Sequence, residues 1–143
     1  TNLRQTRIAT ANYTNDASFF VKCIVGEKNF QKKKCEKIDG YFLNDCLSHD
    51  ELVVESFKED NIRPKFKCRI VKTANHKRFE GFNRAQSSIV EACILATRVK
   101  FLKKKKILTD LEFLYSSVEK TAGLKELKLW EKIKKFIFKE MEK

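Results

Sequence analysis

The chain has 143 residues, a length typical of one domain that buries a hydrophobic core. Hydrophobic residues account for 42% and charged residues for 35%, with 4 glycines and 1 proline, which excludes a collagen-like or low-complexity chain. Lysine and arginine outnumber aspartate and glutamate by 31 to 19, and the resulting net charge of +12 makes an anionic partner worth testing.

The first elements expected along the chain are a strand, a short helix and a hairpin. Residues 8–13 mix alternating hydropathy with small side chains, a pattern typical of a short strand. Asp16 can cap a helix that ends at Gly26. Residues 52–57 and 66–71 then predict a β-hairpin with one face in the core and one basic face in water.

Three helices are expected after these strands. Asn83 is the predicted cap of one long helix over residues 83–102, whose buried stripe should consist of Ala85, Ile89, Ala92, Cys93, Ala96 and Val99. Thr109 predicts the start of the next helix and Gly123 its end. The apolar side of the third helix should be Leu127, Trp130, Ile133, Ile137 and Met141. Strands first and helices last indicate an α+β domain.

The sequence offers few groups for catalysis or metal binding. His49 and His76 each stand in a polar, loop-like setting without a second ligand at metal spacing, which predicts solvated histidines and no metal site. The five cysteines are odd in number and form no Cys-x-x-Cys pair, so we expect reduced thiols and a cytoplasmic location. No apolar run is long enough for a membrane helix, and no Walker loop or nucleophile elbow is present.

A line of charge on the long helix is the unusual feature. Arg84, Glu91 and Arg98 are spaced seven residues apart, which places them on nearly the same helix face. One interpretation is a set of structural ion pairs that anchor the helix to the sheet or to a second subunit. The other is that Asn83, Arg84 and the free amides of the helix N-terminus bind an anion such as phosphate.

The same helix carries a family resemblance. Residues 81–98, GFNRAQSSIVEACILATR, closely resemble a segment with the pattern N-R-A, V-E-A and A-T-R in the largely archaeal DUF447 family, whose reaction is not established. The opening TNL, the ATAN of residues 9–12 and the NDASFF of residues 15–20 are similar to that family in the same order. The resemblance covers nearly the whole chain.

This resemblance implies an FMN-binding split β-barrel, similar to flavin reductase-like proteins. Part of the barrel is expected in residues 1–80, and a C-terminal three-helix region in residues 81–143 that packs on it within one structural unit. The family's segment that ends in an Asn-Leu pair, expected near the flavin phosphate, is here Thr1, Asn2 and Leu3, the very start of the chain. We therefore expect the sequence to begin inside the barrel, with its upstream strands missing.

The resemblance further implies a homodimer whose interface holds FMN and which acts as an oxidoreductase or flavin reductase-like protein on an unknown small-molecule substrate. Thr1, Asn2 and Asn12 are expected near the flavin. Asn83 and Arg84 are expected either at the phosphate region or locking the helix against the barrel. Because the cofactor would carry the redox chemistry, missing catalytic groups do not argue against this function.

Two alternatives from other functional classes stay open. Residues 61–143 contain 22 basic and 9 acidic residues, a net charge of +13, which would suit a non-catalytic module that binds nucleic acid or another polyanion. Solvated helix faces explain most of this charge, since no RNA-binding or helix-turn-helix motif accompanies it. The other alternative is a structural dimer that has lost its flavin site.

Overall fold

The computed structural model describes residues 2–60 and 62–143, apart from the side chain of Asn2, and the chain divides into two compact units. The sheet unit contains the residues up to 14 and residues 30–79. The helical unit contains residues 15–29 and 80–143. No helix in the described part of the chain is both long and apolar enough to cross a membrane.

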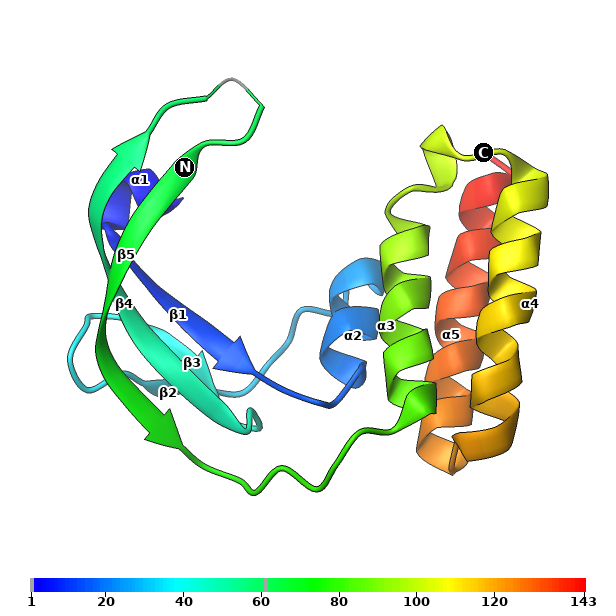
Figure 1. The fold of residues 1–143 in the computed structure, drawn as a ribbon, viewed down its shortest axis with the longest axis horizontal. Coiled ribbons are helices and arrows are strands. Elements are labelled where there is room, and N and C mark those ends of the chain that lie inside the picture. The colour runs from blue at the N-terminus through cyan, green and yellow to red at the C-terminus, as the bar shows by residue number, and fades with distance from the viewer. Residues whose placement is uncertain (1, 61) are drawn as a thin grey trace. The chain divides into compact units, whose positions relative to one another are not determined.

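The sheet unit is built from antiparallel strands. After the short helix α1 (Asn2–Thr6), its strands are β1 (Ile8–Tyr13), β2 (Lys32–Lys34), β3 (Tyr41–Leu43), β4 (Ser48–Lys58) and β5 (Lys65–Asn75). The order in the larger sheet is β1-β4-β5, and β2 pairs with β3 in a separate ribbon (Figure 1). The described strands form open sheets and not a closed barrel.

The hairpin of β4 and β5 is longer than the sequence predicts and it curves (Figure 1). Its register shifts between Glu51 and Leu52 and again between Val54 and Ser56. Such irregularities add bend and twist to a strand pair and change which side chains share a face. Consistent with this, Ile70, predicted on the apolar face, is 55% exposed.

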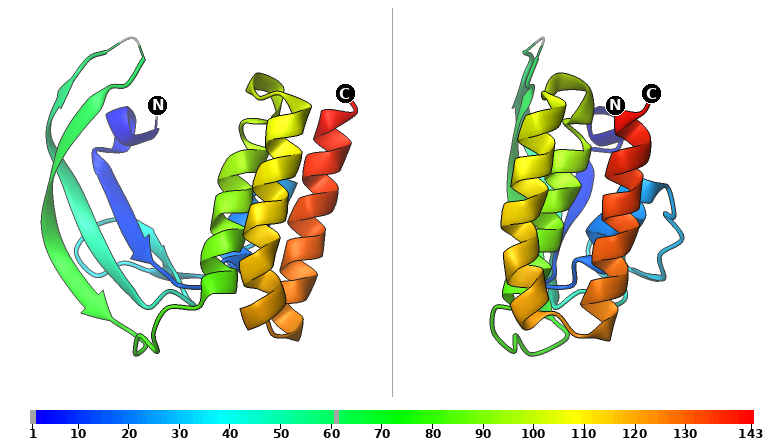
Figure 2. Two further views of the ribbon diagram at one scale, coloured as in Figure 1. Left: turned by 45° about the vertical axis from the view of Figure 1, so that its right-hand side comes forward. Right: turned by 90° about the vertical axis from the view of Figure 1, so that its right-hand side faces the viewer.

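The helical unit packs four helices around one apolar core. These are α2 (Ser18–Val25), α3 (Arg84–Ala96), α4 (Lys104–Thr121) and α5 (Leu124–Met141), with a 3-10 turn, η1 (Val99–Phe101), after α3. Figure 2 shows α3, α4 and α5 running side by side, and α2 contacts both α3 and α5. The predicted buried stripe is confirmed, with its last residue, Val99, in η1. In α5 the central positions Trp130, Ile133 and Ile137 are buried as predicted, whereas Leu127 is 38% exposed.

Two helix boundaries differ from the prediction. Helix α3 ends at Ala96 and not near residue 102, because the backbone changes there to a tighter turn. The Thr97 hydroxyl donates to the Ile94 carbonyl, and the Arg98 N–H donates to the Leu95 carbonyl. Helix α4 begins at Lys104, so Thr109, its predicted cap, lies inside the helix.

The short helix α2 ends at Gly26 as predicted, and the predicted cap Asp16 lies one residue before the helix N-cap, Ala17, but still bonds to the first turn. Asp16 Oδ1 accepts a hydrogen bond from Ser18 N–H at 2.9 Å, which satisfies a donor of the first turn. Gly26 closes the helix with φ of 88°, a left-handed conformation that glycine adopts at little cost. Ala17 and Val21 are fully buried, so this helix contributes side chains to the core of the helical unit.

Candidate functional site

Consecutive polar residues of β4 are buried in the sheet unit. His49, Asp50 and Glu51 are 2%, 7% and 1% exposed. Because successive side chains of a strand point to opposite faces, His49 and Glu51 share one face and Asp50 lies on the other. Buried polar groups need partners, and each of the three has them.

Glu51 anchors the segment that covers its face of the sheet. Its carboxylate accepts backbone N–H bonds from Glu36 at 2.8 Å, Lys37 at 2.6 Å and Ile38 at 3.0 Å. Burial opposes ionisation of this carboxyl, but these bonds and His49 outweigh it and hold the pKa of Glu51 below its ordinary value. The charge of Glu51 therefore fixes the connection between β2 and β3.

His49 lies beside His76, and the ring of Phe42 stacks on both. The Phe42 ring lies 4.0 Å from that of His49 and 4.8 Å from that of His76, and the two histidine rings lie 5.0 Å apart, all with nearly parallel planes. His49 Nδ1 and His76 Nε2 are 2.8 Å apart, a hydrogen-bond distance, so one of these nitrogens carries the proton. Partial desolvation of the His76 ring, then the charges of His49 and Lys33, lower the pKa of His76. The prediction that His49 is solvated and isolated is wrong, because strand pairing brings distant groups around it.

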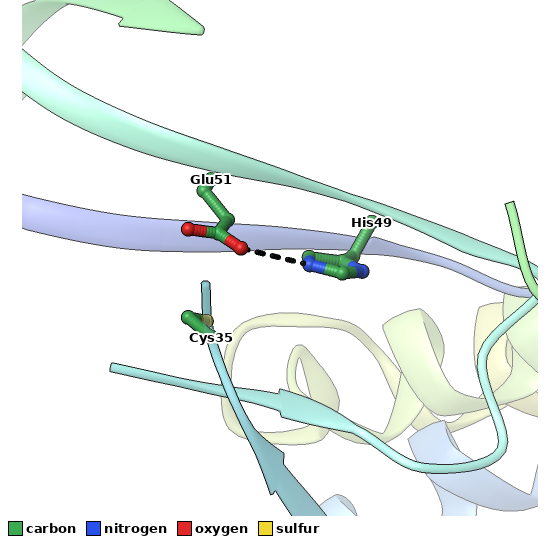
Figure 3. A group of neighbouring side chains, drawn as sticks. All are labelled: Cys35, His49 and Glu51. Carbon is green, nitrogen blue, oxygen red and sulfur yellow. Dashed lines mark hydrogen bonds and ion pairs between the residues drawn. The ribbon is translucent and has the colours of Figure 1, made fainter. Parts of the chain in front are cut away.

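Cys35 completes a cluster of potential metal ligands. One ligand atom from each of Cys35, His49 and Glu51 lies within 4.8 Å of the other two, and all three residues are buried (Figure 3). Burial, then the nearby charge of Glu51, raises the pKa of the Cys35 thiol. The sequence contained a weak signal for this site, a histidine and a glutamate at alternate positions of a strand, but nothing that linked them to the cysteine.

The opposite face of β4 holds a separate hydrogen-bonded carboxylate. Tyr13 Oη donates to Asp50 Oδ2 at 2.7 Å, and Thr73 Oγ1 donates to Asp50 Oδ1 at 2.6 Å. The Thr73 bond, followed by the Tyr13 bond, holds the pKa of Asp50 below its ordinary value. Tyr13 lies on β1 and Thr73 on β5, so Asp50 joins the three strands.

Among the predicted flavin residues, Asn12 lies beside the buried cluster. It is the register partner of His49, and its Oδ1 accepts the Leu43 N–H at 2.8 Å, which holds β3 against β1. Thr1 lies outside the described residues, and so does the side chain of Asn2. A role of these three residues toward a flavin stays a prediction.

Asn83 and Arg84 belong to the other unit, at the start of α3. Asn83 Oδ1 accepts from the amides of Ala85 at 2.8 Å and Gln86 at 3.2 Å, which confirms it as the helix cap. These amides are therefore not free for an anion. Arg84 is exposed and donates from Nη2 to Ser117 Oγ at 2.9 Å.

Glu91, like Arg84, is exposed on α3, whereas Arg98 is exposed but lies after the end of the helix, so the three charges do not share one helix face as predicted. Within the helical unit, and for the residues that the structure describes, none of the three takes part in an ion pair. Their predicted pairing with another surface stays a prediction.

Family models and one solved structure resemble the chain. A model described as the N-terminal domain of a protein of unknown function (DUF447) matches residues 1–77, and one described as a protein of unknown function (DUF447) matches residues 83–135. The FMN-bound protein MM1853 from Methanosarcina mazei, assigned to DUF447, has a TM-score of 0.76 at 17% identity, over 94% of this chain and 74% of that one. No curated protein matches. The structural similarity shows the fold.

Proposed function

The chain belongs to the DUF447 family, and from this premise we propose that it binds FMN and serves as a flavin-dependent oxidoreductase or flavin reductase-like protein. The observation that carries the proposal is the fold shared with the FMN-bound protein MM1853 over 94% of this chain. When bound, FMN supplies hydride and electron transfer, while a protein binds and orients it. The small-molecule substrate is unknown.

The residues present suit the chemical parts of FMN. A phosphate needs a cationic donor, and the guanidinium of Arg84 is exposed, with one of its five N–H groups given to Ser117. A flat, apolar ring system packs well on aromatic side chains, and the sheet unit exposes Tyr13, Tyr41 and Phe57 by 50%, 58% and 39%. The exposed guanidinium is the feature that supports the proposal that Arg84 contacts the phosphate.

A homodimer with a split barrel is the second part of the proposal. In the order β1-β4-β5, the strands β1 and β5 are the edges of the larger sheet, and edge strands carry unpaired backbone groups. The apolar side chain of Ile70, on β5, is 55% exposed. We propose that a second copy of the chain covers part of this surface.

A titration with two flavins tests the binding proposal. FMN and riboflavin share the ring system and differ in the phosphate, so both are titrated into the purified chain while flavin fluorescence is followed. Arg84→Ala should weaken FMN about tenfold, the loss of one charge-assisted contact, and leave riboflavin unchanged. Arg98→Ala, which removes an exposed arginine just after the other end of α3, is the matched control and should bind both flavins as the unchanged chain does.

The outcomes separate the parts of the proposal. Absence of saturable binding of either flavin would contradict flavin binding by this chain. Equal effects of the two arginine substitutions would leave the flavin site in place and remove Arg84 from it. Analytical ultracentrifugation with and without FMN measures the dimer, and a monomer under both conditions would contradict the homodimer.

Polyanion binding is the second candidate function. Lys103, Lys104, Lys105 and Lys106 are consecutive and exposed, and Lys103 makes no side-chain capping bond at the start of α4. Positive side chains repel the positive end of a helix dipole, and a bound polyanion would offset this repulsion. Duplex DNA affinity should then fall with salt by about 0.9 log units per log unit of salt for each phosphate neutralised. Unaltered salt dependence after replacing these lysines by glutamine would contradict this role.

A further inference from the structure

We propose that Cys35, His49 and Glu51 form a binding site for a divalent metal ion of the zinc type. The inference is independent of flavin binding and rests on the buried cluster in the sheet unit (Figure 3). Thiolate, imidazole and carboxylate are the three side-chain ligands that Zn²⁺ accepts. A soft sulfur and an imidazole nitrogen in the same set disfavour Mg²⁺ and Ca²⁺, which prefer oxygen ligands.

The spacing of the histidine nitrogen and the carboxylate oxygen suits a tetrahedral ion, and the sulfur lies close enough to become the third ligand with a small shift. With metal–ligand bonds of about 2.0–2.3 Å, neighbouring ligand atoms of a tetrahedron lie roughly 3.3–3.7 Å apart. His49 Nε2 and Glu51 Oε1 are 3.5 Å apart, which is long for a hydrogen bond and within this range. The Cys35 sulfur is in the same group, in which all ligand atoms lie within 4.8 Å.

The surroundings of His49 orient its ring for this role. Metal-binding histidines commonly donate the N–H of their second nitrogen to a neighbour, which fixes the ring and leaves the other nitrogen as a ligand. Here His49 Nδ1 is 2.8 Å from His76 Nε2, and Phe42 stacks on the His49 ring at 4.0 Å. With the proton on Nδ1, the lone pair of His49 Nε2 faces the carboxylate of Glu51, an arrangement that a cation between them stabilises.

Glu51 has room for a metal in addition to its backbone bonds. Its Oε2 accepts from Lys37 and Ile38, whereas Oε1 accepts only one backbone N–H, from Glu36, and is the oxygen that faces His49. A carboxylate oxygen has two lone pairs, so Oε1 keeps one for a metal.

The charges of the site balance when a divalent ion binds. A carboxylate and a thiolate supply two negative charges and a neutral imidazole none, so the buried centre becomes neutral with Zn²⁺. Three protein ligands leave a fourth position for water or a small ligand, as in zinc sites with an open coordination position. The ion would also tie Cys35, the first residue of the connection between β2 and β3, to β4.

Cobalt is the probe for the test, because Co²⁺ replaces Zn²⁺ and its thiolate complexes absorb in the near ultraviolet. The full chain, with its thiols reduced and metals removed by a chelator, is titrated with Co²⁺ and then with Zn²⁺. We expect saturation at one Co²⁺ per chain, a sulfur-to-cobalt absorption band, and loss of the band when Zn²⁺ is added.

Three variants locate the site. Cys35→Ser should abolish the sulfur-to-cobalt band, and both Cys35→Ser and His49→Gln should weaken cobalt binding by at least about 100-fold. Cys46→Ser is the control, because Cys46 is a buried cysteine of the same unit outside the cluster, and it should keep the band and the affinity. Far-ultraviolet circular dichroism checks the folding of each variant.

A measurement on the unchanged chain keeps the proposal testable if a variant fails to fold. X-ray absorption of the zinc complex should show one sulfur neighbour at about 2.3 Å and nitrogen or oxygen neighbours at about 2.0–2.2 Å. Absence of saturable metal binding, zinc without a sulfur neighbour, or a cobalt band that survives Cys35→Ser would overturn the proposal.

Discussion

Replacing Glu51 by glutamine should release the connection between β2 and β3 from the sheet. The substitution keeps the size of the side chain but turns one carboxylate oxygen into an NH₂ group. That group cannot accept the backbone N–H bonds that Glu36, Lys37 and Ile38 donate to the carboxylate. The experiment is done with a chelator present, so that the anchoring role is measured without a metal.

The size of the effect follows from these bonds. A hydrogen bond to a charged acceptor contributes about 1.5–3 kcal/mol, and two of the three bonds end on Oε2. If glutamine keeps the one bond to its remaining oxygen, the free energy of unfolding of the sheet unit should fall by about 3–6 kcal/mol. The full value applies only if the amides stay buried, and local opening of the segment would lower it.

Hydrogen exchange of the amides of Glu36, Lys37 and Ile38 is the local assay, and urea unfolding followed by circular dichroism is the global one. Glu55→Gln is the matched control, because Glu55 is on the same strand but is exposed, with ion pairs to Lys67 and Arg69. It should cost less than about 1 kcal/mol. Unchanged exchange at the three amides, or equal losses of stability in both variants, would refute the anchoring role of Glu51.

Three further predictions concern the helical unit. Burial opposes ionisation of Asp16, but Lys125 and Ser18 hold the pKa of its carboxyl below the ordinary value. Asp16→Asn should therefore cost about 1 kcal/mol in urea unfolding at pH 7, and this difference should shrink as the pH falls below about 4 and disappear below the pKa of the folded state; a difference that stays constant with pH would contradict the role of the charge. Asn83→Ala should lower the free energy of thermal unfolding by about 1 kcal/mol through loss of the cap of α3. An unchanged stability would contradict this and would show that Thr121 Oγ1, which also accepts the Ala85 amide, caps the helix without Asn83. Ile133→Ala should lower the unfolding free energy by about 2–5 kcal/mol because Ile133 is fully buried, and a change below about 1 kcal/mol would show that the core collapses around the gap.

The helices were more predictable than their boundaries. The stripe from Ala85 to Val99 recurs at helical spacing, and burial follows this local pattern because one face of each helix meets the core. The capping signal at Thr109 was wrong because α4 gains a full turn from Lys104 onward, where no capping side chain marks its start. Packing against α3 and α5 outweighs the unfavourable charges of this first turn.

The buried cluster could not be found from local patterns. His49 and Glu51 alternate on one strand, but Cys35 and His76 reach them only after β2, β3 and β5 have paired. The two histidines therefore looked solvated when each was considered by itself. Sequence alone did identify the family and the capping role of Asn83, because both depend on a contiguous segment.

The path of the chain between the two units limits how the gene could be divided. The family models separate near residue 80, yet Ala17 and Val21, encoded before most of the sheet, lie in the core of the helices. Recombination that moved residues 80–143 alone into another protein would leave the places of both side chains empty and the apolar faces of α3 and α5 partly uncovered. The segments matched by the two family models are therefore expected to be inherited together and not to recombine as independent domains.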